Sequence, residues 1–147
     1  MPIELNHRFT FDHYVVGQAN RLASAAGRRV AEMPGQAYNP LFVYSGSGLG
    51  KTHLLNAIGH HARRLHPNFT VVYYTLEHFL DVALELIESG EREELRSRVE
   101  RIGFLLLDDV QFLAGRLAAQ DELLRAWDAA SARGGQVVLA SDRPPSE

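Results

Sequence analysis

The glycine-rich segment Tyr44–Thr52, which reads YSGSGLGKT, constrains the fold more than any other feature of the sequence. The apolar run Leu41–Tyr44 precedes it, and the amphipathic run His53–Leu65 follows it. A strand, a glycine-rich turn and a helix in this order are typical of a phosphate-binding loop, because glycines let backbone N–H groups approach phosphate oxygens. The positive end of the following helix dipole adds to this preference for anions.

Two side chains at the end of this segment carry the expected chemistry. Lys51 is predicted to reach the terminal phosphates of a nucleotide, and the Thr52 hydroxyl is predicted to bind Mg²⁺. Lys51 is also the only lysine in the sequence. The full pattern G-x-x-x-x-G-K-[ST] has glycine where this chain has Ser45, and serine costs about 1 kcal/mol if that position needs a positive φ. The alternative is a strand-to-helix turn that binds no ligand.

Length and composition narrow the class of protein. With 147 residues, the chain is expected to form one domain. It has no cysteine, so neither a disulfide nor a cysteine metal site can form. No apolar run approaches the roughly 20 residues of a membrane span, and Met1–Thr10 lacks a signal-peptide core, so we expect a cytoplasmic location. A net charge of −3 argues against a self-sufficient DNA-binding domain, although not against a local basic patch.

The rest of the chain alternates apolar runs with amphipathic ones. Strands are expected at Leu41–Tyr44, Val71–Thr75, Phe104–Leu107 and Val137–Ala140. The helices between them are expected to bury apolar faces that include Met33, Leu65, Leu84, Leu124 and Trp127. Because each strand is apolar throughout, we predict an α/β domain whose parallel sheet is covered by helices on both faces, the core of a P-loop NTPase.

Acidic residues follow two of the predicted strands. Asp108 and Asp109 come directly after Phe104–Leu107, and the carboxyl ends of parallel strands lie beside the phosphate loop. Asp108 can then hold the Mg²⁺ shell, and Asp109 can orient or polarise the attacking water. Asp142 follows the fourth strand, where it either contacts the γ-phosphate or the water, or belongs to a turn before two prolines. Position alone leaves these two interpretations open.

Histidines and arginines form two further groups. His60, His61 and His66 are close in sequence, but their spacing does not match a zinc motif, and we favour a solvated helix surface. Four arginines alternate with glutamates on the helix expected over 91–101, and this pattern favours an exposed face with ion pairs. They are Arg92, Arg96, Arg98 and Arg101.

Several longer motifs point to a particular family. They are Phe9-Thr10-Phe11-Asp12, Val15-Val16-Gly17, Tyr38-Asn39-Pro40-Leu41-Phe42, Gly48-Leu49-Gly50-Lys51-Thr52-His53-Leu54, Asp108-Asp109-Val110-Gln111-Phe112-Leu113-Ala114-Gly115 and Ser141-Asp142-Arg143-Pro144-Pro145. With these motifs the chain resembles, nearly from end to end, the AAA+ ATPase module of the bacterial chromosomal replication initiators, the DnaA family. The resemblance implies that ATP or ADP binds with Mg²⁺, and that family members assemble as filaments on origin DNA and open the duplex.

The resemblance also implies roles for individual residues. The adenine would lie beside Tyr14, Val16, Gly17 and Asn20. The phosphates would lie against Gly46, Ser47, Gly48, Leu49, Gly50, Lys51, Thr52 and His53. Catalytic roles would fall to Lys51, the Walker B pair Asp108 and Asp109, and the sensor Asp142, with Thr52 and Asp108 on the metal. Arg96 and Arg98 would be candidates for contacts with single-stranded DNA.

The sequence departs from the family pattern at Ser45, over residues 116–120 and at Trp127-Asp128. The family's fifth strand, arginine finger, lid and helix-turn-helix domain would all lie beyond Glu147, so residues 1–147 are expected to form a partial AAA+ domain of about four strands with no lid. Arginine fingers are worth roughly 10³ to 10⁵ in rate, so hydrolysis by this chain should be slow. Leu41–Tyr44 would be an exposed apolar edge that favours self-association. The alternatives are a DnaA-like regulatory ATPase paralogue that does not itself bind origins, and an interaction module with a degenerate nucleotide site.

Overall fold

A computed structural model describes residue 5 and residues 21–36, 39–44, 48–113, 117–132 and 134–141. Its centre is a parallel sheet with the strand order β1-β4-β3-β2. The strands are β1 (Leu41–Tyr44), β2 (Val71–Thr75), β3 (Phe104–Asp108) and β4 (Gln136–Ser141). All four agree with the predicted strands to within one residue, and the predicted parallel α/β architecture is confirmed.

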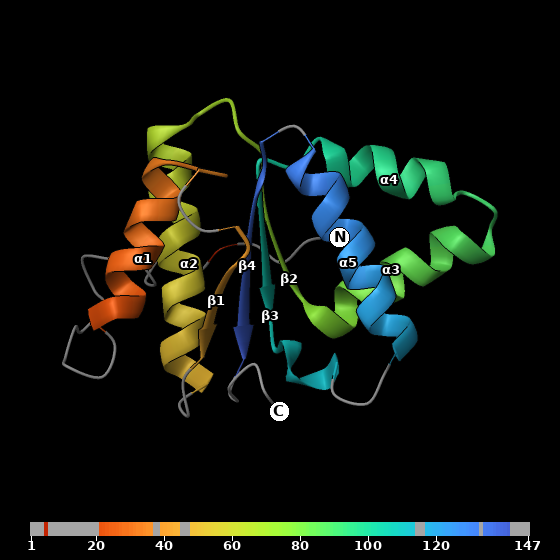
Figure 1. The fold of residues 1–147 in the computed structure, drawn as a ribbon, viewed down its shortest axis with the longest axis horizontal. Helices are drawn as coiled ribbons and strands as arrows, with labels where there is room; N and C mark the ends of the chain where they lie inside the picture. The colour runs from red at the N-terminus through yellow and green to blue at the C-terminus, as the bar shows by residue number, and fades with distance from the viewer. Residues whose placement is uncertain are drawn as a thin grey trace.

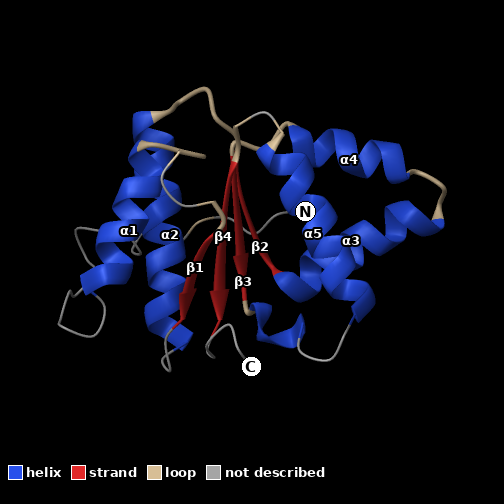
Figure 2. Cartoon of the chain, in the orientation of Figure 1, coloured by secondary structure: helices blue, strands red, loops and turns tan. Residues whose placement is uncertain are grey.

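Helices cover both faces of this sheet (Figures 1 and 2). On one face lie α1 (Arg21–Glu32) and α2 (Gly48–Leu65), and on the other lie α3 (Leu76–Glu88) and α5 (Leu117–Ser131), with α4 (Arg92–Glu100) packed on both of them. A 3-10 turn, η3 (Val110–Leu113), follows β3. Each face has its own apolar core: Leu106 belongs to the core under α1 and α2, whereas its neighbours Leu105 and Leu107 belong to the other core. This burial of both faces explains why the strands are apolar throughout.

Two sequence expectations about the helices are corrected. The helix after the phosphate loop was expected to begin at His53, but α2 begins at Gly48, so the glycine-rich motif itself forms the first turn. Four apolar residues that were expected to be buried are instead exposed: Met33, Leu65, Leu84 and Leu124.

Among the described strands, β1 lies at one end of the sheet and pairs only with β4, as expected for an edge. The expected exposure of its apolar side chains is wrong, however. Leu41 and Val43 are buried, because they pack into the core under α1 and α2. Phe42 is half-buried, and the expected self-association stays a prediction.

Asn39, in the Tyr-Asn-Pro motif, ties the start of β1 to the start of β4. Its Nδ2 donates to the carbonyl of Gly135 at 2.9 Å and to Ser131 Oγ at 3.3 Å, and its Oδ1 accepts from Val137 N at 3.0 Å. The neighbouring Gln136 is fully buried, and its Oε1 accepts from Gly35 N at 2.8 Å. These bonds satisfy backbone groups at the rim of the sheet and hold β1 in register with β4.

We expect Asn39→Ala to lower the free energy of unfolding by about 1–3 kcal/mol, because it leaves the Val137 N–H and the Gly135 carbonyl without their side-chain partner. Urea unfolding followed by circular dichroism measures this difference. Asn68→Ala, at an exposed position in the turn before β2, is the matched control and should change stability by less than about 0.5 kcal/mol. Equal stability of the two variants would contradict this role for Asn39.

Candidate nucleotide-binding site

The candidate site lies at the edge of the sheet where the parallel strands end. The strand arrows and the first turn of α2 come together there, at the lower edge of the view in Figure 1. Asp108 is the last residue of β3 and lies opposite Thr75, the last residue of β2. The topology thus brings a glycine-rich helix start and a carboxylate, which are far apart in sequence, to one place.

Lys51 is buried within α2, and its ammonium group faces both acidic residues of the Walker B pair. Its Nζ lies 2.8 Å from Asp108 Oδ1 and also pairs with Asp109 Oδ1. Lys51 is only 4% exposed and Asp108 only 2%. Because buried charges are costly without a partner, each group depends on the other.

The Asp108 carboxylate accepts a hydrogen bond from each of four groups. Oδ1 accepts from Lys51 Nζ and, at 2.9 Å, from the backbone N–H of Asp109. Oδ2 accepts from Thr52 Oγ1 at 2.8 Å and from the Tyr73 hydroxyl at 2.6 Å. The carboxylate is therefore held on both oxygens, and its direction is fixed before any ligand binds.

Asp109 differs from Asp108 in both backbone and exposure. Its φ of 59° lies in the left-handed region, which aspartate enters more readily than most residues. Its side chain is about a third exposed, and its Oδ1 also accepts from Gln111 Nε2 at 3.3 Å. The left-handed turn directs the chain from β3 into η3 and leaves this second carboxylate more open to solvent than the first.

The acidic pair shifts the pKa of its neighbours. Burial lowers the pKa of Lys51, but the hydrogen bonds and negative charges of Asp108 and Asp109 outweigh it, so the pKa is raised above 10.5. Burial also raises the pKa of Tyr73, and its hydrogen bond to Asp108 raises it further. At neutral pH the site therefore holds a charged ammonium and a neutral phenol.

The donor set fits a magnesium nucleotide. Mg²⁺ prefers hard oxygen ligands, and the Thr52 hydroxyl and the Asp108 carboxylate supply such oxygens side by side. The helix start at Gly48 suits the phosphates, because the first turn of a helix favours anions. Asn56 Nδ2 donates to the Thr52 carbonyl at 2.8 Å and so steadies this turn from within α2.

The structure brings together most of the predicted residues that it describes. Gly48, Leu49, Gly50, Lys51, Thr52 and His53 all lie in the first turns of α2, and Asp108 and Asp109 lie beside them. The other predicted residues lie outside the described ranges: Tyr14, Val16, Gly17, Asn20, Ser45, Gly46, Ser47 and Asp142. Sequence reasoning missed Tyr73. Its position in β2 could have indicated the role. Tyr73 lies two residues before Thr75, so both point to the same face of the sheet, and Thr75 lies opposite Asp108.

The arginines predicted as a nucleic-acid contact lie on α4, away from this edge. Arg96 Nε lies 3.1 Å from Glu100 and Arg98 Nε lies 3.0 Å from Glu94, which confirms the predicted ion pairs. Both arginine side chains are more than half exposed, at 65% and 56%. Such exposed pairs are worth about 0–1 kcal/mol, so the guanidinium groups can exchange partners at little cost.

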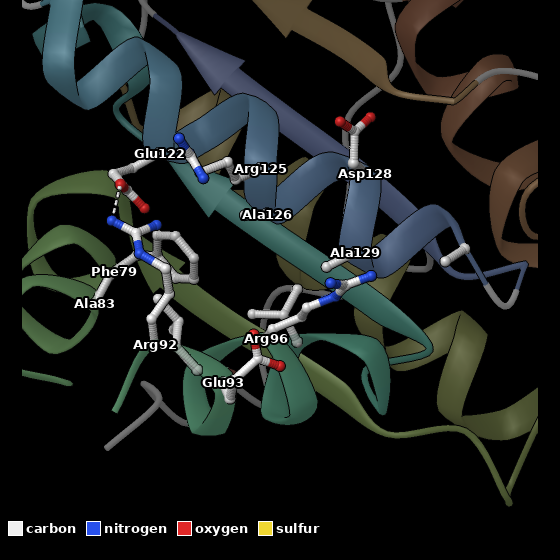
Figure 3. Close-up of a pocket in the computed structure, with 13 residues that line it drawn as sticks. Phe79, Ala83, Arg92, Glu93, Arg96, Glu122, Arg125, Ala126, Asp128 and Ala129 are labelled. Carbon is white, nitrogen blue, oxygen red and sulfur yellow. Dashed lines mark hydrogen bonds and ion pairs between the residues drawn. The ribbon is translucent and has the colours of Figure 1, made fainter. Parts of the chain in front are cut away.

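A cavity of about 350 Å³ lies between α3, α4 and α5 (Figure 3). An ion pair between Arg92 and Glu122, 3.2 Å long, joins α4 to α5 at this cavity. The apolar part of the lining is formed by Phe79, Ala83, Leu95, Val99, Ala126, Ala129 and Ala132. In Figure 1, α4 lies beside the starts of the strands, so the cavity is separate from the site of Lys51 and Asp108.

The histidine prediction is corrected in part. His61 is not solvated: its side chain is 9% exposed and lies between Glu32, at 3.5 Å, and Arg64, at 2.7 Å. His66 is half-buried and lies 2.9 Å from the Ala31 carbonyl. Across the described ranges, no three residues of the His, Cys, Asp or Glu type are grouped so as to hold a metal ion. Nor is any helix described here both long enough and apolar enough to cross a bilayer.

Comparisons with known proteins agree with this geometry. The family described as "Bacterial DnaA ATPAse domain" matches residues 5–147. The chain is similar to domain III of the replication initiation protein DnaA from Thermotoga maritima, with 41% identity and a TM-score of 0.90 over 99% of this chain. It is also similar to AMPPCP-bound DnaA from Aquifex aeolicus, with 36% identity and a TM-score of 0.86 over 97% of this chain. A replication initiator DnaA bound to AMPPCP and single-stranded DNA matches at 36% identity, with a TM-score of 0.87 over 97% of this chain.

The chain spans 60% of the Thermotoga chain and 44% of each of the other two. Similar proteins have thus been seen with a nucleotide analogue and with single-stranded DNA, and this chain shares their fold over nearly its whole length.

The raised pKa of Lys51 can be measured directly, because a protein grown with isotope-labelled lysine gives one set of lysine signals. We expect a titration midpoint above 10.5. The contribution of this group to the free energy of unfolding is then fully present below pH 10.5 and is lost as the pH rises through the raised pKa. In Asp109→Asn, which keeps a residue that tolerates the left-handed backbone, the midpoint should fall. An equal midpoint in the unmodified protein and in Asp109→Asn would rule out a contribution of the Asp109 ion pair to this pKa.

Proposed function

This chain belongs to the family of bacterial DnaA ATPase domains. We propose that it binds ATP or ADP with Mg²⁺, and that the bound nucleotide controls its assembly on DNA. The observation that supports this most directly is the convergence of Lys51, Thr52, Asp108 and Asp109 at one edge of the sheet. Lysine and a hydroxyl at a helix start, beside a strand-end carboxylate, form the combination that P-loop proteins use for a magnesium nucleotide.

Each of these residues has a distinct part in the proposal. Thr52 and Asp108 hold the metal, which neutralises phosphate charge when bound. Lys51 exchanges its two carboxylates for phosphate oxygens, and the start of α2 surrounds the phosphates with backbone dipoles. Asp109, with its more exposed carboxylate, orients and polarises the attacking water.

The remaining parts of the proposed nucleotide site come from the family resemblance. Tyr14, Val16, Gly17 and Asn20 would border the adenine, and Asp142 would sense the terminal phosphate. The reaction would be hydrolysis of ATP to ADP and phosphate, slow unless an arginine finger is supplied to the site. As a replication protein acting on chromosomal DNA, the chain would work in the cytoplasm.

For the DNA-binding part of the proposal, α4 is the candidate interface. Arg96 and Arg98 are exposed, and each makes a weak ion pair with a glutamate of its own helix. A single-stranded phosphate backbone would release counterions as it takes up these guanidinium groups. A similar initiator has been seen with single-stranded DNA, and this chain would make such contacts within a larger assembly on origin DNA.

Lys51→Ala should weaken binding of a fluorescent ATP analogue in the presence of Mg²⁺ roughly 10- to 100-fold, because a charged phosphate partner is lost and two acids face the phosphates without compensation. Fluorescence titration measures the dissociation constant. Arg125→Ala, at an exposed position on α5, is the control and should bind as the unmodified protein does. Absence of saturable binding by the unmodified protein would overturn the proposed nucleotide site, and equal binding by Lys51→Ala would overturn the role of its ammonium group.

The DNA proposal is tested by Arg96→Ala and Arg98→Ala in a titration with short oligothymidine at several salt concentrations. We expect weaker binding and a slope of log K against log salt that is shallower by about 0.7 for each arginine removed. Fluorescence anisotropy gives both quantities. Arg64→Ala removes the same charge from α2, on the other face of the sheet, and should leave the slope unchanged. The same loss in all three variants would indicate a general charge effect and would exclude α4 as the interface.

A further inference from the structure

Tyr73 is a buried residue whose polar group reaches the site and to which neither sequence motif assigns a role. Its ring lies within the core under α1 and α2 and is 6% exposed, and its hydroxyl donates to Asp108 Oδ2 at 2.6 Å. It belongs to β2, whereas Asp108 belongs to β3, and Thr75 rather than Tyr73 lies opposite Asp108 in the strand register. The tyrosine side chain therefore spans the distance along the sheet from mid-strand to the site.

The two oxygens of the Asp108 carboxylate have different kinds of partner. Oδ2 is held by two hydroxyl groups, those of Tyr73 and Thr52. Oδ1 is held by the backbone N–H of Asp109 and by the ammonium group of Lys51. Of the four donors, only Lys51 is expected to leave when a nucleotide arrives, since its charge then serves the phosphates. Oδ1 is thus the oxygen that changes partner, and Oδ2 is the oxygen that stays fixed.

We propose that Tyr73 is a positioning residue that holds the Asp108 carboxylate in the orientation needed to bind Mg²⁺ once Lys51 has moved to the nucleotide. The inference rests on the proposed function, since it assumes that Asp108 is a metal-binding group. Tyr73 does not touch the nucleotide or the metal in this scheme. It acts through Asp108, as hydrogen-bond partners of metal-binding carboxylates do.

The chemistry of the phenol suits this task. A phenol is neutral at physiological pH, so the Tyr73 hydroxyl carries the proton that it donates to Asp108 Oδ2. Among the described residues, Oδ2 would keep only the Thr52 hydroxyl as a partner if the Tyr73 hydroxyl were removed. A carboxylate held by fewer donors can rotate, and binding of the metal must then restrict that rotation.

The next residue provides a matched control. Tyr74 belongs to the same strand but to the other apolar core, where its ring packs edge-on against His78 and Phe79, with ring centres 5.1 and 5.7 Å apart. Tyr73→Phe and Tyr74→Phe each remove one hydroxyl from β2 and keep the ring. Only Tyr73→Phe removes a donor from Asp108.

The test is a titration of Mg²⁺ against binding of a fluorescent ATP analogue by the unmodified protein and both variants, with binding in EDTA measured in parallel. We expect Tyr73→Phe to raise the Mg²⁺ concentration at half-saturation about tenfold, the lower end of the range for such hydrogen-bond partners. Binding in EDTA should not change, because Lys51 and the start of α2 remain intact. Tyr74→Phe should match the unmodified protein under both conditions.

The outcomes separate this inference from the function on which it rests. If the unmodified protein depends on Mg²⁺ and Tyr73→Phe shows the same dependence, the positioning role is overturned while the nucleotide site stands. A loss of binding by Tyr73→Phe that is equal in Mg²⁺ and in EDTA indicates a merely structural role and also overturns the inference. Nucleotide binding that is independent of Mg²⁺ in the unmodified protein overturns both the metal role of Asp108 and the role of Tyr73.

Discussion

The buried carboxylate of Asp108 is the feature on which the rest of the site depends. Removing a carboxylate and an ammonium group from water costs several kcal/mol for each ion, and their attraction compensates only when the remaining hydrogen bonds are also made. Here donors from α2, β2 and the turn after β3 all converge on one side chain. Such a pair is weak grounds for stability, since apolar residues could fill the same space. The proposed binding of a magnesium nucleotide explains the burial of these charged groups better than stability does.

The fold provides what this cluster requires. A parallel sheet brings the ends of β2 and β3 to one edge, and α2 begins at that edge because the glycine-rich motif forms its first turn. The apolar cores on both faces keep the strands in place, while Asn39 fixes the register of β1 with β4 at the opposite edge. The arginines of α4 and the neighbouring cavity lie away from Lys51 and Asp108, so the sites proposed for nucleotide and for DNA are in different parts of the molecule.

The sequence predicted the architecture and the central residues because both are encoded locally. Apolar runs of strand length predicted the sheet. Lys51 stands near the end of the glycine-rich motif and Asp108 directly follows an apolar run, and in a parallel sheet both positions lie at the strand ends. The role of Tyr73 was not predicted, because a strand that is apolar on both faces does not show from its residue types which face carries the site. His61 was wrongly placed in solvent because its contact with Glu32 joins two helices, and such pairing is not visible along one helix. The start of α2 was placed too late because glycine has a low intrinsic helix preference.

The left-handed backbone of Asp109 has a consequence for how this protein can vary. Among the residues that carry a carboxylate, aspartate accepts that conformation more readily than glutamate, so the position is constrained by shape as well as by charge. A lineage that abandons hydrolysis but keeps the fold has few substitutions open to it here, chiefly asparagine and glycine. Under the catalytic role proposed for Asp109, either of these residues in a natural relative would mark a protein that has lost hydrolysis but kept its architecture, whereas a branched residue would mark one whose strand-end turn has been rebuilt.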